Sequence, residues 1–426
     1  MKRALLTLST IIFTILAASA APKKIVVKVT NPGETRRSVP VVISVDKKVR
    51  TAVVTLFDKE IPCQLDDLND DGIYDELCFL TDIGKKETLE FKVTLDTEGT
   101  QTIYKPLLTY GYLGIRDRDK SAKKPSHQEI TSVTFPASTN PYNYIFPHGA
   151  VMENDMVGFR VYCDHRQSID YYGHRTRKLD IAETGFYPTP EQKAEGSGDD
   201  VLYTGSTYGC GALHAWDAEK RWSVMFEKCR NHTQTIVTQG PIRTIVDITN
   251  KEWQPFSDKK PVDITTRYTL YAGHRDVQVD VKFSRNVADI PLSTGIVDIV
   301  EGSEAFSDKA GLRGCWGTAC AGNNPKVYDT HTVGLGICVP KKYYKEDSYF
   351  SDRKESLPNQ AYVEIIGTRT NNLHYWFTVT CDMETFGFNS KEAWFKYLRE
   401  WKKELASDVK ISVSKEKKPK KTDETK

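Results

Sequence analysis

The stretch TTRYTLYAGHRDVQVDVKF, residues 265–283, indicates the fold class of this chain. Residues 265–271 and 277–283 are short runs rich in β-branched and aromatic residues, which is typical of strands. The intervening residues 271–276 have the composition of a hairpin turn. Further strand-like runs at 157–163, 243–249, 334–339, 361–366 and 374–380 have no helices between them. This pattern favours antiparallel pairing, so we expect a large β-domain over residues 136–408.

Two smaller segments precede this body, and a helix and a tail follow its strands. Residues 22–97 contain five short strand-like runs with turn residues between them, which predicts a small β-sandwich. Residues 98–135 are expected to form a connector and the start of the body. Ser390 can cap a helix whose apolar residues recur at helical spacing: Ala393, Trp394, Tyr397, Leu398, Trp401 and Leu405. Residues 409–426, rich in lysine, are expected to be disordered.

The first twenty residues predict export from the cytoplasm. Lys2 and Arg3 precede an apolar run that ends in Ala18-Ser19-Ala20, the layout of a cleaved signal peptide. No cysteine lies at the cleavage site, so we expect a periplasmic or secreted protein without a lipid anchor. The later sequence contains no run long and apolar enough to span a membrane. Without the leader and the tail, the charge of the body is slightly negative, which argues against nucleic acid as a partner.

The nine cysteines allow two readings in an oxidising compartment. Cys63 could pair with Cys78 across a hairpin, and Cys315 could pair with Cys320 around a short loop. The odd number leaves at least one thiol free. The alternative is that the cysteines are buried free thiols that pack as small hydrophobic side chains.

An acidic loop predicts a structural calcium site. Residues 67–75 read DLNDDGIYD, with oxygen donors spaced as in short calcium loops and a glycine at the sharp turn. The expected ligands are Asp67, Asn69, Asp71, Asp75 and the backbone of Ile73. The position of the final glutamate of an EF-hand is Cys78 here. The alternative is a loop whose side chains bond only to its own backbone.

Polar and aromatic residues are densest between His148 and His174. Along residues 157–163, alternation places Val157, Phe159, Val161 and Cys163 on one face, and Arg160, Tyr162 and Asp164 on the other. Glu153 and Asp155 are expected to point to one side as paired carboxylates.

The runs HGAVMEND (148–155), GFRVY (158–162) and DHRQSIDYYG (164–173) resemble an exported bacterial family catalogued as a domain of unknown function (number four-eight-six-one). This resemblance implies polysaccharide utilisation in Bacteroidetes, beside enzymes that degrade pectin-like polymers. It also implies that the large domain is a galactose-mutarotase-like β-supersandwich.

We therefore expect an enzyme that cleaves uronate- or rhamnose-containing oligosaccharides, by hydrolysis or β-elimination. The expected catalytic residues are His148, Glu153, Asp155, Tyr162 and His165. The expected substrate-binding residues are Arg160, Asp164, Arg166, Asp170, Tyr171, His331 and His374. A non-catalytic sugar-binding or epimerase-like protein is the alternative, and a structural partner in a glycan-handling complex is a third. Within the cluster, Arg160 could form only a salt bridge with Asp164, and His148, Glu153 and His165 could bind a metal.

Overall fold

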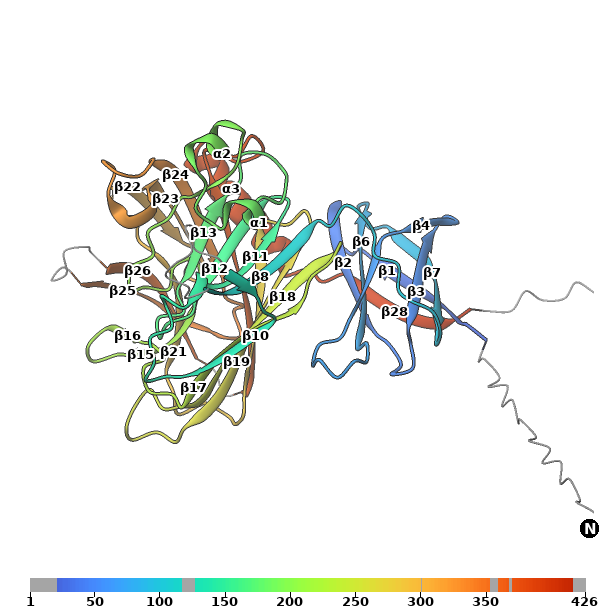
Figure 1. Cartoon of the computed structure of the whole chain (residues 1–426), viewed down its shortest axis with the longest axis horizontal. Helices are drawn as coiled ribbons and strands as arrows, with labels where there is room; N and C mark the ends of the chain where they lie inside the picture. The colour runs from blue at the N-terminus through green and yellow to red at the C-terminus, as the bar shows by residue number, and fades with distance from the viewer. Residues whose placement is uncertain (1–20, 117–126, 300, 353–358, 368–369, 417–426) are drawn as a thin grey trace, which may run out of the picture.

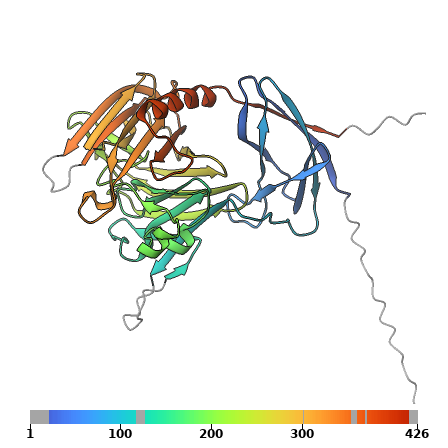
Figure 2. The same cartoon turned by 90° about the horizontal axis from the view of Figure 1, so that it is seen from above.

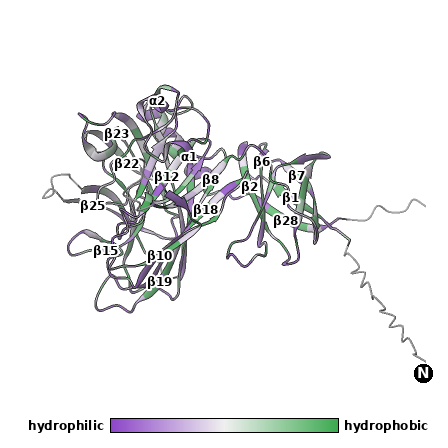
Figure 3. Cartoon of the chain, viewed as in Figure 1, coloured by the Kyte–Doolittle hydropathy of each residue, from purple (hydrophilic) through white to green (hydrophobic). Residues whose placement is uncertain are grey.

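The computed structural model describes residues 21–116, 127–299, 301–352, 359–367 and 370–416, so the expected leader lies outside the described residues. The described chain is mainly β, with antiparallel sheets and a C-terminal helix, as predicted. A small β-sandwich and a larger body lie side by side (Figure 1). In Figure 3, hydrophilic and hydrophobic residues are mixed along the strands, as expected where one strand face packs on a core and the other does not.

The small sandwich has two sheets, which enclose a core of valine, isoleucine, leucine and phenylalanine side chains. The five-stranded sheet has the order β28 (Lys410–Lys415), β1 (Lys23–Thr30), β7 (Thr88–Asp96), β3 (Thr51–Leu56) and β4 (Lys59–Ile61). The other has the order β2 (Arg36–Ser44), β6 (Glu76–Ile83) and β5 (Cys63–Asp66).

The body is a sandwich of one nine-stranded sheet against a six-stranded and a five-stranded sheet. The first has the order β10 (Ser132–Pro136), β17 (Asn231–Thr238), β18 (Arg243–Trp253), β19 (Val262–Tyr271), β20 (Asp276–Phe283), β27 (Asn372–Cys381), β24 (His331–Cys338), β23 (Leu312–Ala319) and β22 (Glu301–Ser307). The second has the order β14 (Asp199–Asp200), β13 (Ile169–Gly173), β12 (Val157–Tyr162), β11 (Ile145–Asn154), β8 (Thr109–Arg116) and β9 (His127–Glu129). The third has the order β16 (Trp222–Val224), β15 (Leu213–Asp217), β21 (Leu292–Val297), β26 (Asn359–Ile366) and β25 (Tyr344–Asp352).

The helices cover the outer faces of these sheets. The predicted helix is α3 (Lys391–Leu405), and the Ser390 hydroxyl accepts the N–H of Ala393 at 3.2 Å, as predicted for its cap. Trp394, Leu398 and Trp401 pack on β23 and β24. Two short helices, α1 (Ile181–Thr184) and α2 (Pro190–Ala194), and a 3₁₀ turn, η1 (Ala321–Asn323), complete the elements. No helix in the described ranges has the length and apolarity that a membrane span needs.

The expected disorder of residues 409–426 is wrong for its first part. Lys410–Lys415 form β28, which follows α3 and pairs antiparallel with β1 (Figure 2). Ile411 and Val413 alternate with polar residues, so this segment can add a strand to the open edge of β1. Residues 417–426 lie outside the described residues.

The Cys63–Cys78 and Cys315–Cys320 disulfides are not formed, because Cys63, Cys78 and Cys315 are free thiols. Cys63 lies opposite Phe79, and Cys78 lies opposite Gln64, so the two cysteines are one register position apart and face opposite sides of their sheet. Cys315 is buried, and its thiol lies 3.8 Å from the carbonyl of Val297. The alternative, buried thiols that pack as small side chains, describes most of the nine.

Buried polar contacts join the two parts. Arg243 in β18 pairs with Asp66 of β5 at 2.8 Å, and the amide of Gln64 donates to the Arg243 carbonyl at 3.0 Å. Nearby, a cleft of about 840 Å³ separates β2 from β20, β27 and the end of α3. None of the predicted site residues lines this cleft.

Candidate functional site

The candidate site lies on the outer face of the six-stranded sheet, on β11, β12 and β13. The predicted alternation is confirmed, because Val157, Phe159, Val161 and Cys163 are in the main core. Arg160 and Tyr162 therefore project from the opposite face. Arg160 lies between Val151 of β11 and Asp170 of β13 in the strand register. The chain between β13 and β14, which includes α1 and α2, covers part of this face through Ile181 and Phe186.

We define the Arg160 cluster as Arg160, Tyr162, Asp170, Tyr187 and Asp200. The Arg160 side chain is buried, and its Nη2 contacts Asp170 and donates to the Tyr162 hydroxyl at 2.8 Å. Its Nη1 donates to the Tyr187 hydroxyl at 2.5 Å. Tyr162 in turn donates to Asp170 at 2.9 Å. Asp200 completes the cluster, 3.4 Å from Arg160 Nη2.

Aromatic rings surround this guanidinium. Phe186 lies 4.1 Å from it, and the rings of Tyr162 and Tyr187 lie 4.6 and 5.5 Å away. Such contacts stabilise a cation that has left water. The outer members are less enclosed, since Tyr187 is 45% exposed and the mostly buried Asp200 side chain is 11% exposed. The cluster thus has a fixed interior and a surface that solvent reaches.

His148 lies at the edge of the cluster, at an irregular point of β11. The pairing of β11 with β8 shifts register between Phe146 and Val151, and His148 has a φ of 72°. Bulges and positive φ values of this kind re-aim side chains near functional sites. A Cβ on Gly149 would lie 1.9 Å from the Val161 carbonyl oxygen, so only glycine fits there. His148 stacks on Tyr142 with the ring centres 3.9 Å apart, and it meets Tyr187 edge-on.

The protonation of His148 follows from its partner. Its Nδ1 lies 2.6 Å from the carbonyl oxygen of Tyr142, which can only accept a hydrogen bond. Nδ1 therefore carries the proton, and Nε2 has a free lone pair. Burial lowers the pKa of His148 to about 4, and the guanidiniums of Arg160, Arg116 and Arg166 lower it as well. The imidazole is neutral at neutral pH and can accept a proton.

Asp200 has the opposite character. Burial raises its pKa well above the ordinary value, and the nearby carboxylate of Asp170 raises it further, whereas Arg160 lowers it. Burial and the neighbouring carboxyl group therefore favour the protonated form of Asp200. Two close carboxyl groups, one of which is favoured in its protonated form, are a typical arrangement for acid–base chemistry. Asp170 itself is fully buried and bonded to Arg160, Tyr162 and the N–H of Tyr171, so it positions the others.

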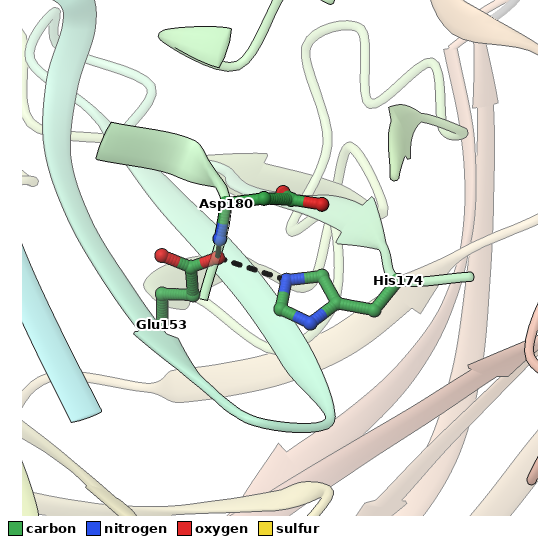
Figure 4. Close-up of side chains that lie close together, drawn as sticks. All are labelled: Glu153, His174 and Asp180. Carbon is green, nitrogen blue, oxygen red and sulfur yellow. Dashed lines mark hydrogen bonds and ion pairs between the residues drawn. The ribbon is translucent and has the colours of Figure 1, made fainter. Parts of the chain in front are cut away.

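Glu153 belongs to a second, buried group with His174 and Asp180 (Figure 4). Glu153 Oε1 accepts the N–H groups of Asp180 and Ile181 at 2.7 and 3.0 Å, and it lies 3.1 Å from His174 Nε2. Burial raises the pKa of Glu153. Since the side chains are at most 2% exposed, a sugar cannot reach them. The position of Glu153 therefore does not fit the catalytic role that the sequence predicted for it.

Several other predicted residues lie apart from the cluster. Because β11 ends at Asn154, Asp155 lies in the following turn and accepts the N–H of Gly273 at 2.7 Å, so it is not paired with Glu153. Tyr171 alternates to the core face and donates to Glu384 at 2.6 Å. His165 is half-exposed, 3.9 Å from Glu227. The alternative in which His148, Glu153 and His165 bind a metal is not supported, since each of these residues has different neighbours.

Of the remaining predicted binding residues, some lie at the edge of the Arg160 cluster and others lie apart from it. Asp164 pairs with Arg166, whose Nη2 donates at 2.6 Å, and Arg166 lies 4.8 Å from the Tyr162 ring at the cluster's edge. The predicted Arg160–Asp164 salt bridge is thus replaced by two separate pairs. His331 contacts Asp382 at the start of β24, and His374 lies on β27 against Tyr343 and Trp376.

The acidic loop at Asp67 is closed by its own backbone. Asp67 accepts the N–H of Gly72 at 2.7 Å, Asp71 accepts that of Ile73 at 2.9 Å, and Asp75 accepts that of Leu68 at 2.8 Å. Asn69 also accepts the N–H of Asp71. These bonds are the ones expected for the self-capped loop, and calcium binding stays a prediction.

Sequence reasoning missed three members of the site, Tyr142, Tyr187 and Asp200. Tyr187 and Asp200 lie on the chain that folds back over the sheet, outside the densest polar stretch. The sequence signal was weak, because Asp200 is one of two adjacent aspartates and only its tertiary neighbours distinguish it.

Comparison with known proteins places the chain in a family. A model described as Domain of unknown function (DUF4861) matches residues 29–411. The chain belongs to this family. A search of the curated proteins finds no match.

Among solved structures, a family 38 glycosyl hydrolase protein from Enterococcus faecalis is similar at 9% identity, with a TM-score of 0.47. The match covers 94% of this chain and 48% of that one. An α-mannosidase from Enterococcus faecalis V583 is similar at 8% identity and a TM-score of 0.45, over 92% of this chain and 46% of that one. This DUF4861 chain therefore spans about half the length of each.

Proposed function

We propose that this protein hydrolyses glycosidic bonds in oligosaccharides at the Arg160 cluster. The observation that carries the proposal is the placement of an imidazole and a carboxyl group around Arg160 and Tyr187. His148 is neutral with a free Nε2, and burial favours the protonated form of Asp200, while both remain within reach of solvent. General acid and base groups of this kind are the ones that glycoside hydrolysis requires.

The reaction would use one residue as the general acid and another as the general base. Asp200 gives its proton to the glycosidic oxygen as the bond to the anomeric carbon breaks. His148 Nε2 takes a proton from the water whose oxygen bonds to that carbon. The partly exposed rings of Tyr142 and Tyr187 offer apolar faces on which a pyranose can stack.

The pairing of the arginines favours hydrolysis over β-elimination. Elimination from a uronate needs a cation to neutralise the sugar carboxylate. In the described part of the cluster, Arg160 is held by Asp170 and Arg166 by Asp164. The family resemblance suggests uronate- or rhamnose-containing, pectin-like substrates outside the cytoplasm, and the paired cations favour a neutral sugar such as rhamnose at the cleaved bond.

The test is incubation of the protein with a panel of pectic, alginate and ulvan oligosaccharides, read by mass spectrometry and ultraviolet absorbance. We expect products whose summed mass exceeds the substrate by one water, with no new absorbance. Products of unchanged summed mass with a conjugated double bond would contradict hydrolysis and support elimination. A ligand-dependent rise in melting temperature without product would contradict catalysis and support a sugar-binding protein.

A further inference from the structure

The group of Glu153, His174 and Asp180 has no role in the proposed reaction, yet it is a buried polar group on this face of the sheet. The three side chains come from β11, from the residue after β13 and from the residue before α1. One ligand atom from each lies within 4.8 Å of the other two. They are 0, 0 and 2% exposed.

Their hydrogen bonding is incomplete. Glu153 Oε2 and Asp180 Oδ1 have no partner among the described residues, and neither ring nitrogen of His174 makes a directed hydrogen bond. Buried polar atoms in folded proteins are normally satisfied, so several unsatisfied atoms in one place call for an unseen partner. Backbone N–H groups already occupy Glu153 Oε1, and the N–H of Gly198 donates to Asp180 Oδ2 at 2.9 Å. The free atoms are thus held in place by their partnered neighbours.

The charge balance also points to a cation. Two buried carboxylates face one imidazole, and Lys178, 3.8 Å from Asp180, is partly exposed at 38%. Buried charges need a counter-charge, and a divalent cation would balance both carboxylates while the histidine stays neutral. Figure 4 shows the three side chains arranged around a common point, with the His174 ring paired with the Glu153 carboxyl group.

We propose that Glu153, His174 and Asp180 bind a divalent transition-metal cation of the zinc class. Imidazole nitrogen and carboxylate oxygen are ordinary ligands of Zn²⁺. The ion would join the sheet to the covering chain, because Glu153 belongs to the sheet and Asp180 precedes α1. A Cβ on Gly158, the register partner of Glu153, would lie 2.4 Å from Ile181, so the covering chain packs directly on the strands here.

The site has a positioning role for the Arg160 cluster. The chain that follows Asp180 carries Phe186 and Tyr187, which contact Arg160. Binding the cation would hold this chain on the sheet. The inference does not rest on the proposed hydrolysis, since metal content is measured without any sugar.

The experiment is elemental analysis of the purified full chain after dialysis against Zn²⁺ and then metal-free buffer. We expect about one zinc ion per chain, and a melting temperature that EDTA lowers and added Zn²⁺ restores. The variant His174→Gln should lose the zinc and its response to EDTA. The matched control His331→Gln, at a histidine that pairs with the partly exposed Asp382, should keep both.

Wild-type protein settles the question even if His174→Gln fails to fold. A chain that holds no stoichiometric zinc, with the same melting temperature in EDTA and in Zn²⁺, would overturn the proposal. Glu153 and His174 would then be a buried structural pair that shares a proton. Zinc retained by a folded His174→Gln variant would overturn it as well.

Discussion

At the scale of single residues, the site depends on two protonation states that the fold sets in opposite directions. Burial and three guanidiniums lower the pKa of His148 to about 4, and burial beside Asp170 raises the pKa of Asp200. Neither state follows from the residue types, since a free histidine titrates near neutral pH and a free aspartate is ionised there.

The first prediction concerns the pH dependence of kcat/KM. His148 acts as a base only when it is neutral, so activity should rise as the pH increases through about 4, the pKa of this histidine. Activity should fall at higher pH, when Asp200 loses its proton. The measurement is kcat/KM for an oligosaccharide substrate across this range. The variant His148→Gln should lower the rate by about 10²–10⁴-fold and remove the acidic limb. An unchanged acidic limb in that variant would exclude His148 as the base.

The sequence predicted part of this site because alternation is a local property. Residues 157–163 revealed which side chains share a face, so Arg160 and Tyr162 were placed correctly. The same reasoning failed at Asp155, where the strand had already ended. It could not find Asp200 or Tyr187, because their position depends on how a later segment folds over the sheet.

At the scale of elements, the helix α3 shows how local sequence and tertiary packing combine. Its apolar residues recur at helical spacing, and its first turn is capped by Ser390. Trp394 and Leu398 need space on the sheet, which Gly334 and Gly336 provide: a Cβ at those positions would lie 2.8 and 2.4 Å from them. Both signals agree, which is why this helix was predictable.

The second prediction tests the cap. Ser390→Ala removes the hydroxyl that accepts the N–H of Ala393, so the free energy of unfolding should fall by about 1 kcal/mol. Denaturant unfolding measures this difference. Ser390→Asp, which keeps a cap acceptor, should restore most of the loss. If Ser390→Ala and wild type unfold at the same denaturant concentration, the hydroxyl does not stabilise the helix.

The strand β28 was not predicted, because its alternation is short, it leads into a lysine-rich tail and none of its residues is buried. The segment becomes a strand because its backbone pairs with the open edge of β1. An open edge can order a nearby segment whose sequence would otherwise suggest a tail. Tertiary pairing also explains why Cys63 and Cys78 form no disulfide, since the strand register places them on opposite faces of their sheet.

At the scale of the whole molecule, the two parts are joined by a charged core. Asp66 is fully buried, and it accepts hydrogen bonds from Arg243, Gln64 and Thr238. A second link runs from the His274 ring to the Ser38 carbonyl at 2.8 Å. Nothing in the local sequence around residues 64–66 or 243 marks these contacts, because they join segments that are far apart in the chain.

The third prediction concerns this joint. Asp66→Ala leaves Arg243 buried with the partly exposed Glu76 as its remaining paired carboxylate, so the free energy of unfolding should fall by about 3–5 kcal/mol. Chemical denaturation with fluorescence detection measures the loss. Glu90→Ala, which removes an exposed ion pair with Lys28, is the matched control and should change little. Equal effects of the two variants would show that the buried contacts do not stabilise the joint.

The most direct test of the central claim compares two adjacent aspartates of β14. Asp200 faces the Arg160 cluster, whereas Asp199 pairs with Lys193. We predict that Asp200→Asn lowers kcat for oligosaccharide hydrolysis by about 10²–10⁴-fold without loss of folding, because the amide cannot give a proton to the glycosidic oxygen. Asp199→Asn should keep wild-type activity. Equal activity of the two variants would contradict the assignment of this cluster as the catalytic site.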